Sequence, residues 1–449
     1  MFIELKYFWG RLNANYWFWP ALFSITGAIL ALAMIWLDRN GFAEWLNDVR
    51  WIVPARPSGA ANMLGVMASS MIGVASTVFS ITIAAVAYAS GNYGPRLLTN
   101  FMEDRGNQLS LATFIGSFVY ALVVLRSVRT EEETASSLAD AATTAMPGFT
   151  PQLSLLVAYL LMALCVGVLV FFLNHIPSSI RINKVLEGIG VRLLEAIRET
   201  YPVEDTLRDA VRPKDGRDLV SQHTGYIQLI DFAELQDLAQ EHEAMFSLTA
   251  RTGDFVHRDL PLMKVSGVDP DAIADAVRRC YTLGPTRTPE QDPQFLMDEL
   301  VEIGLRALSP GINDPFTAIT ALHWLGAATA EIGRRDLRKD LSGDEAEDSR
   351  VTPCPDDFAH FAQRGFGSIR SAAATSPNAA VVMLESIENA ARPIQHPRRI
   401  QVLREEAEKL VVQARLALSG PDLETLEGRF TEFTGAMLSM DVRAGSPAA

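Results

Sequence analysis

The sequence predicts a mainly α-helical membrane protein with four transmembrane helices, then a small β-rich, barrel-like module and a helical C-terminal domain. Long uncharged apolar runs lie almost entirely before His175, and charged clusters lie after it. Each run provides the roughly 20 apolar residues that cross a hydrocarbon layer of ~30 Å. The predicted parts are a transmembrane domain over 1–175, an amphipathic exit helix over 176–200, a β-rich module over 218–266 and a helical domain over 267–442.

The first predicted span runs from Tyr16 to about Leu37. Aromatic residues at its start are typical of a membrane interface, and Pro20 suits the first turn of a helix, where no N–H donor is needed. The run is too long for the core of a cleavable signal peptide, which favours a retained membrane helix. It ends at the polar pair Asp38 and Arg39.

Spans two and three, Met63 to Tyr88 and Leu109 to Leu125, carry hydroxyl groups among their apolar residues. The hydroxyls recur at spacings near three and four, so each helix presents them on one face. Such a face either packs against another helix or faces water, and both alternatives stay open at this point. The candidate pore-lining residues are Ser69, Ser76, Thr77, Ser80, Thr113, Ser117 and Tyr120.

The loop between these spans contains Arg96, and Arg105 follows it shortly before span three. Both are candidate pore-mouth residues, because a ring of arginines in an oligomer attracts anions. The alternative is that these arginines pair with Glu103, Asp104 or lipid phosphates.

The fourth predicted span, Leu153 to Leu173, is uncharged and more apolar than spans two and three. Four spans place both termini on one side of the membrane, and Lys and Arg near the spans are more numerous on that side. This bias predicts cytoplasmic termini and a cytoplasmic soluble region. Apolar residues at helical spacing from Ile182 to Ile197 then predict the amphipathic exit helix, nearly continuous with span four.

The β-rich module is predicted from residue alternation and from turn residues, with strands near 225–230, 246–250 and 261–265. The phrase Gly253 to Val256 resembles the closing half of the barrel-sandwich fold of biotinyl and lipoyl carriers. Lys264, however, lies downstream of this phrase, whereas the modified lysine of the carriers lies upstream. We therefore expect a structural strand here. Helices are predicted at about 270–282, 294–308, 316–335, 356–374, 377–391, 397–417 and 421–437.

The sharpest motif of the helical domain is the junction from Arg306 to Ala318. Ser309-Pro310-Gly311 ends one helix, and Asn313 or Asp314 caps the next. One interpretation is a polar pocket, and the other is a well-capped tight turn. The candidate pocket residues are Arg306, Ser309, Asn313, Asp314 and Thr317.

Several stretches together resemble the bacterial membrane-protein family catalogued as domain of unknown function 2254. This resemblance covers most of the chain and implies a multi-pass protein of the inner, or plasma, membrane with a soluble C-terminal region. It carries over no catalytic residue, cofactor or substrate. The stretches are the 306–318 junction, Gly94-Pro95-Arg96-Leu97-Leu98 with Asn100-Phe101 and Asp104-Arg105, the run Phe114 to Leu122, and the pair His175-Ile176.

Several classes of function are disfavoured by composition. The net charge of −14 disfavours nucleic acid as a partner. The three cysteines are scattered and the histidines match no metal-site spacing. No phosphate-binding loop or nucleophile motif appears, so we expect no catalytic residue, no metal, no cofactor and no enzymatic activity.

Two functional hypotheses lead, and an enzyme that uses the Ser309–Thr317 pocket is the least favoured third. The first is a homo-oligomeric channel in which spans two and three surround an axis and the cytoplasmic region assembles or gates it, for an ion or ligand that the sequence does not identify. The second is a binding or signalling module for which the helical bundle is only an anchor in the lipid bilayer.

Overall fold

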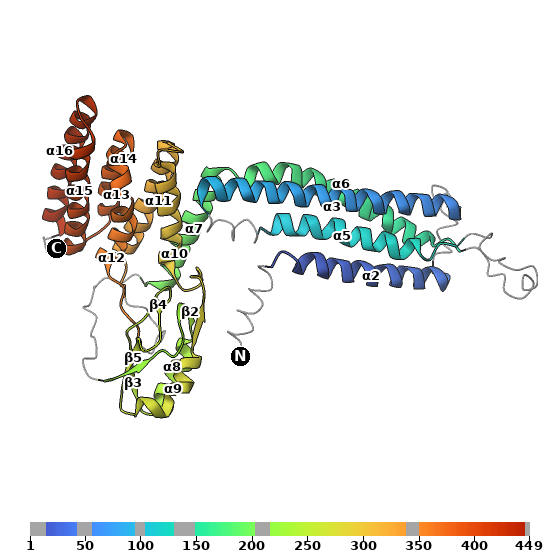
Figure 1. The fold of residues 1–449 in the computed structure, drawn as a ribbon, viewed down its shortest axis with the longest axis horizontal. Helices are drawn as coiled ribbons and strands as arrows, with labels where there is room; N and C mark the ends of the chain where they lie inside the picture. Colours follow the sequence, from blue (N-terminus) through green and yellow to red (C-terminus); the bar gives the residue numbers. More distant parts are fainter. Residues whose placement is uncertain are drawn as a thin grey trace, which may run out of the picture. The chain divides into compact units, whose positions relative to one another are not determined.

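A computed structural model shows two compact units, each described here by itself (Figure 1). The first unit comprises Met1–Gly91 and Pro95–Arg181, and the second comprises Asn92–Gly94 and Ile182–Ala449. The residues that the structure describes are 15–42, 56–94, 104–129, 149–202, 216–337 and 350–444.

Among the described residues of the first unit, four helices are long and apolar enough to cross a membrane, which confirms the four predicted spans. They are α2 (Phe18–Arg39), α3 (Pro57–Tyr93), α5 (Arg105–Leu125) and α6 (Gln152–Ser179). Helix α3 has 37 residues, which at 1.5 Å each correspond to about 55 Å. This length exceeds the ~30 Å hydrocarbon layer, so part of α3 extends beyond the layer.

Close contact between α2 and α5 organises the bundle. A Cβ added to Gly27 of α2 would lie 2.5 Å from the carbonyl oxygen of Gly116, and one added to Gly116 would lie 2.9 Å from the carbonyl oxygen of Phe23. Helices in lipid associate by such close packing of small residues, because the lipid tails are as apolar as the side chains.

Carboxylates lie at the ends of the described membrane helices rather than within them. Asp38 accepts hydrogen bonds from the backbone N–H groups of Leu153 and Ser154, at 2.8 and 2.9 Å, and so caps α6 from the end of α2. Asp104 caps α5 through Gly106 N at 2.7 Å and lies 2.9 Å from His175 Nε2 at the end of α6. Each carboxylate thus joins two helices.

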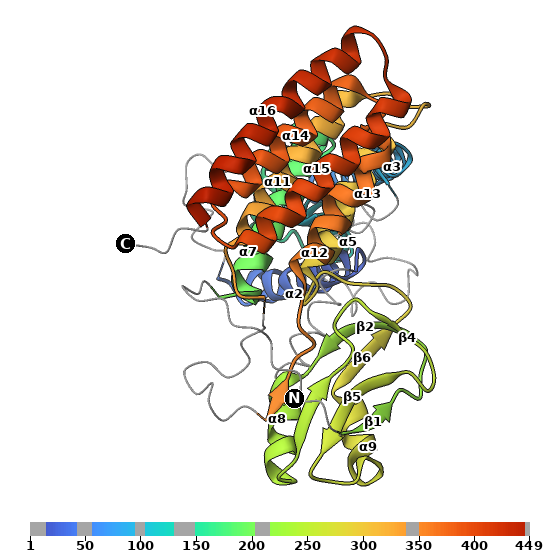
Figure 2. The ribbon, with the colours of Figure 1, turned by 90° about the vertical axis from the view of Figure 1, so that its left-hand side faces the viewer.

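The strands of the second unit form two sheets (Figure 2). In both sheets neighbouring strands are antiparallel, except for the parallel pair β3–β7. Helices α8 (Phe232–Glu241) and α9 (Pro270–Arg279) pack on the same core, which includes Phe246, Leu235 and Val256. The first sheet has the order β1 (Arg217–Val220), β5 (Pro261–Ser266), β3 (Met245–Leu248), β7 (Val351–Thr352), and the second has the order β4 (Phe255–Val256), β2 (Gly225–Ile230), β6 (Tyr281–Gly284).

The remaining helices of the second unit run alongside one another in Figure 2. Helix α7 begins at Ile182, three positions after the last residue of α6, so the predicted near-continuity is confirmed. A π-helical turn, Gln363–Gly367, separates α12 from α13. The helices are α7 (Ile182–Thr200), α10 (Pro293–Ala307), α11 (Pro315–Gly333), α12 (Phe358–Ala362), α13 (Ser368–Ala373), α14 (Pro377–Ala391), α15 (Pro397–Ala417) and α16 (Pro421–Ala444).

The structure differs from the predicted second unit in three details. The helix expected at 270–282 ends at Arg279, because residues 281–284 pair with β2 as strand β6. The helix expected at 356–374 is interrupted by the π-helical turn. Strands β6 and β7 extend the sheets beyond 218–266, and the described strands form two open sheets instead of a closed barrel.

We predict that Gly116→Val lowers the stability of the bundle, because the new side chain would meet the backbone of α2. Overpacking of this kind typically costs ~1–3 kcal/mol. Thermal unfolding of the detergent-solubilised protein measures the effect. Gly167→Val in α6 is the matched control, since a Cβ there meets nothing within 4 Å. Equal unfolding midpoints for the two variants would contradict the assignment of α2–α5 packing as the organising contact.

Candidate functional site

The four candidate pore-lining hydroxyl groups of α3 lie on the face of the helix that is turned away from the rest of the bundle, whereas Thr82 of the same helix is buried. The opposite face of α3 packs into the core, whereas the four side chains are exposed. Each hydroxyl donates to the carbonyl four residues earlier, at 2.8–3.0 Å, so the donor is satisfied while oxygen lone pairs remain available as acceptors. The residues are Ser69, Ser76, Thr77 and Ser80.

The same face of α3 also carries two glycines, beside the exposed apolar side chains of Val66 and Ile72. Gly65 and Gly73 share this face by helical spacing, and a Cβ added to either glycine would meet nothing within 4 Å. We call the surface formed by Gly65, Ser69, Gly73, Ser76 and Ser80 the α3 small face.

The hydroxyl groups of α5 are used inside the bundle instead. Ser117 and Tyr120 are buried. Ser117 Oγ accepts from Cys165 Sγ at 3.2 Å, and the Tyr120 hydroxyl donates to the Ser154 carbonyl at 2.9 Å. Thr113 is half-buried and donates to the Leu109 carbonyl at 2.8 Å. The structure of a single chain therefore does not bring the α5 hydroxyls onto the same surface as those of α3.

The structure describes only one of the two candidate pore-mouth arginines. Arg105 is the exposed first residue of α5. Arg96 lies outside the described residues, so their predicted joint role stays a prediction.

Ser309, Asp314 and Thr317 of the α10–α11 junction use their side chains in hydrogen bonds within the junction. Ser309 Oγ donates to the Arg306 carbonyl at 2.6 Å, and Asp314 accepts from Thr317 N at 3.2 Å and Thr317 Oγ1 at 2.6 Å. Asn313 has a φ of 49°, in the left-handed region that Asn tolerates. Arg306 Nε lies 3.6 Å from Glu302 Oε1. This geometry is that of the capped turn, the second interpretation of the motif.

A network of charges that the sequence did not indicate joins the sheets to the helices of the second unit. At its centre is Asp356, whose side chain is 2 % exposed. Its carboxylate accepts from Arg251 NH1 and from the Tyr201 hydroxyl, each at 2.5 Å, and lies 3.3 Å from Gln294 Nε2. Asp356 thus connects the loop after β3, the end of α7 and the first turn of α10.

The network continues through two more arginines. Arg364, which the π-helical turn presents, donates from Nε and NH2 to the two Asp298 oxygens at 2.6 Å each. Arg287 hydrogen-bonds to Asp298 and also to Asp292, with 2.8 Å between its Nε and Asp292 Oδ2. Asp292 in turn caps α10 through Phe295 N. Each carboxylate of the network therefore has a guanidinium partner.

The environment of the network shifts its titrating groups. Burial, together with the nearby Asp356 charge, raises the pKa of Tyr201 well above its usual value. Burial also raises the pKa of Asp292, although Arg287 acts in the opposite direction. Burial and the neighbouring Arg251 and Arg364 lower the pKa of His360. No set of side chains suited to holding a metal ion occurs among the described residues. The network consists of ion pairs and hydrogen bonds that hold the sheets against the helices of the second unit, and we call it the charged lock.

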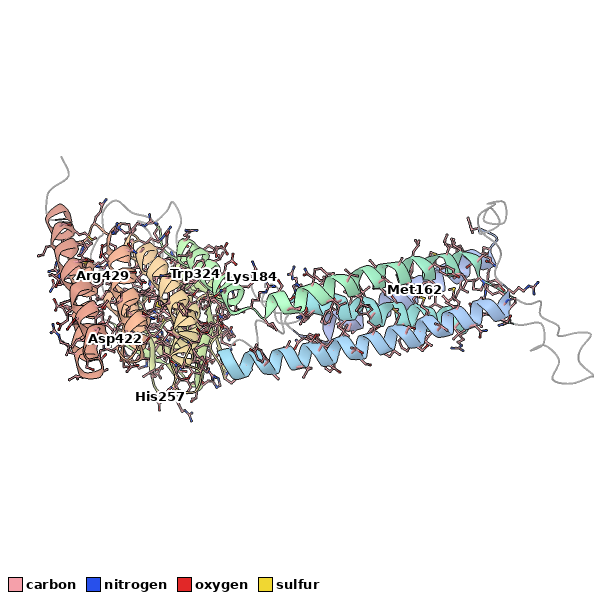
Figure 3. The ribbon with its side chains drawn as sticks, turned by 90° about the horizontal axis from the view of Figure 1, so that it is seen from above. Met162, Lys184, His257, Trp324, Asp422 and Arg429 are labelled. Atoms are coloured by element: carbon pink, nitrogen blue, oxygen red, sulfur yellow. The ribbon has the colours of Figure 1, made fainter. Side chains whose placement is uncertain are left out.

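A second charged cluster joins α14 to α16. Glu388 of α14 accepts from Arg392 NH2 at 2.9 Å and from Arg429 of α16, which is labelled in Figure 3. Burial alone would raise the pKa of Glu388, but the hydrogen bonds from the two arginines outweigh it, so this pKa lies below its usual value.

Comparison with known proteins identifies relatives over most of the chain. A family model described as a predicted membrane protein, domain of unknown function 2254, matches residues 13–389. An uncharacterized protein of Mycobacterium bovis is 30% identical over 374 residues, which cover 81% of this chain and 68% of that protein. An uncharacterized protein of Mycobacterium tuberculosis has the same identity and coverage. No solved structure matches the chain.

We predict that Asp356→Asn destabilises the second unit, because Arg251 loses the charge that compensates its burial. Removing one partner of a buried ion pair costs about 3–5 kcal/mol, and we expect the lower end because Arg251 keeps 25% exposure. Urea unfolding of the full chain measures this loss. Asp218→Asn, which affects an exposed pair with Lys264 at 3.5 Å, should change stability by less than about 1 kcal/mol. Equal losses of unfolding free energy in the two variants would show that Asp356 does not hold the sheets and helices together.

We also predict that the contribution of Glu388 depends on pH. The pKa of Glu388 is lower in the folded than in the unfolded state. Its carboxylate therefore stabilises the fold fully at a pH above the unfolded-state pKa of ~4.3, and this stabilisation is lost as the pH falls through the folded-state pKa. The difference in thermal midpoint between the wild type and Glu388→Gln should therefore shrink below that pH. Glu385→Gln, at a half-exposed position 3.7 Å from Arg429, should give a smaller difference throughout. A difference for Glu388→Gln that is constant with pH would contradict the proposed pairing.

Proposed function

Because the chain belongs to the family of predicted membrane proteins catalogued as domain of unknown function 2254, we propose a function within the bilayer itself. In this proposal several copies associate in the inner membrane through the α3 small face, and their α3 helices line a path for small ions. The soluble second unit lies in the cytoplasm, where it holds or gates the assembly.

The α3 small face is the observation that supports this proposal. A helix surface in contact with lipid has no need of glycine or hydroxyl residues, and surfaces of small residues let helices approach one another closely. The hydroxyls of Ser76 and Ser80 already donate within α3, so their oxygens are free to act as acceptors toward a cation or water. Small side chains and acceptor oxygens together suit a surface at which the α3 helices of several copies meet around a central path.

Ser117 and Tyr120 have a different part in this proposal. Their hydrogen bonds join α5 to α6 within one chain, so they stabilise the unit that presents α3. The proposed lining is accordingly formed by α3, with Ser69, Ser76, Thr77 and Ser80 as its oxygen-bearing residues.

A second candidate function is a membrane-anchored binding or signalling module. It is favoured by the second unit, which has its own hydrophobic core and its own charged lock around Asp356. A pull-down with the full chain in detergent, compared with a chain carrying Asp356→Asn, tests this candidate. A specific partner that is retained by the wild type and lost with the weakened lock would favour it over the channel.

We predict that the purified oligomer conducts ions in planar bilayers and that Ser76→Leu or Ser80→Leu reduces the single-channel conductance by severalfold, because a bulky apolar side chain narrows and dehydrates the path. Thr26→Leu is the matched control. Thr26 is also exposed and also donates to a carbonyl four residues earlier, at 2.8 Å, but it belongs to α2.

Two outcomes would contradict the channel. One is electrical silence of a well-folded oligomer across voltages and ions. The other is an equal effect of the α2 and α3 substitutions, since then the conductance would not depend on the α3 small face. A monomer in native mass spectrometry from mild detergent would remove the oligomeric axis altogether.

A further inference from the structure

The α10–α11 junction exposes large apolar side chains at one end of a helix pair. Leu305 is 36% exposed, Ile312 is 40% exposed and Phe316 is 72% exposed. Ser309 and Asp314 of the same turn use their side chains in hydrogen bonds within it, and these apolar side chains remain exposed beside them. In a domain surrounded by water, such a tip ordinarily carries polar residues, and exposed apolar groups mark contact sites.

Contacts among helices α7, α10 and α11 show which end of the second unit contains the α10–α11 junction. A Cβ added to Gly190 of α7 would lie 2.2 Å from the Trp324 ring of α11, and Arg198 Nε lies 3.3 Å from Glu331 Oε1. Contacts that advance together along both helices show that α7 and α11 are parallel. Figure 3 labels Lys184 and Trp324 on these neighbouring helices.

The start of α7 is therefore level with the junction. Ile182 precedes Gly190 by eight residues, and Phe316 precedes Trp324 by eight residues. Helix α10 runs antiparallel to α11, because a Cβ added to Gly304 would lie 3.6 Å from the Cβ of Ala321 while only a short turn joins the two helices, so the last residues of α10 reach the same level.

The start of α7 is also where the chain arrives from the membrane. Ile182 follows Ser179, the last residue of the apolar helix α6, by three residues, and three residues span at most about 11 Å. Gly94, which directly follows α3 and belongs to the second unit, lies at the same end: a Cβ on it would be 2.6 Å from Glu302 Oε1 of α10. Both connections to the membrane helices thus enter the second unit next to the junction.

From this placement we infer that the α10–α11 junction is a lipid-contacting site, at which Phe316 and Ile312 enter the interfacial layer of the bilayer. Aromatic and aliphatic side chains are stable in that layer. Lys184 is exposed at the level of the junction and pairs with Glu187 at 3.2 Å on the surface, and its positive charge complements anionic phospholipid headgroups. Backbone N–H groups of Ile312, Asn313 and Asp314 donate within the turn, to Ser309 O, Ser309 O and Ala307 O, which lowers the cost of placing this turn beside lipid.

Depth-dependent quenching tests this site in the full chain. The protein carries Cys354→Ser, because Cys165 and Cys280 are buried, and one added cysteine labelled with an environment-sensitive fluorophore. It is reconstituted in vesicles of neutral and anionic phospholipids, some of them with a nitroxide at the headgroup. The matched pair is Phe316→Cys and Phe255→Cys. Phe255 is also an exposed phenylalanine, at 53%, and it lies in the sheet region from which α10 begins.

We expect headgroup nitroxide to quench the label at 316 severalfold more strongly than the label at 255, with Ile312→Cys behaving like 316. Two results would overturn the inference. Strong quenching of 316 by aqueous iodide, with none by nitroxide lipid, would place the junction in water. Protection of 316 from both quenchers would show that protein, such as a second copy of the chain, covers it.

Discussion

Charge buried in the second unit has to be paired, and this requirement decides how its layers are joined. A carboxylate removed from water costs several kcal/mol unless hydrogen bonds and an opposite charge compensate it. Asp356 meets the requirement with Arg251 and Tyr201, and Glu331 of α11 meets it with Arg335, at 2.7 Å, and with Arg198 of α7, at 3.3 Å. Because each carboxylate takes partners from more than one element, it holds those elements together.

The first unit follows the opposite rule. Its described helices carry no charged residue in their apolar centres, and its carboxylates Asp38 and Asp104 act only at helix ends. Between the ends, small residues such as Gly27 and Gly116 bring the backbones together. The two halves of the chain thus use different forces for the same task, because water is present around one and absent around the other.

Much of this architecture could be predicted from residue patterns, and the reasons are local. Apolar length identified the four spans, and the helices predicted at 377–391 and 397–417 match α14 and α15. Strand β6 escaped detection because its identity depends on pairing with β2, more than fifty residues earlier. The Asp356 network escaped for the same reason: its members lie far apart in sequence, and nothing near Arg251 or Tyr201 indicates a shared partner. Periodicity located a hydroxyl face on α5 but could not tell that Ser117 and Tyr120 point into the bundle.

The surplus length of α3 has a consequence for the kinds of bilayer that the protein can occupy. A helix whose apolar stretch exceeds the local thickness adapts by leaning, at a modest free-energy cost per ångström. With 37 unbroken residues, α3 can follow a thinner or thicker membrane by changing its inclination while every backbone hydrogen bond within it stays intact. Lipid composition therefore acts on the angle of this helix and leaves its secondary structure unchanged.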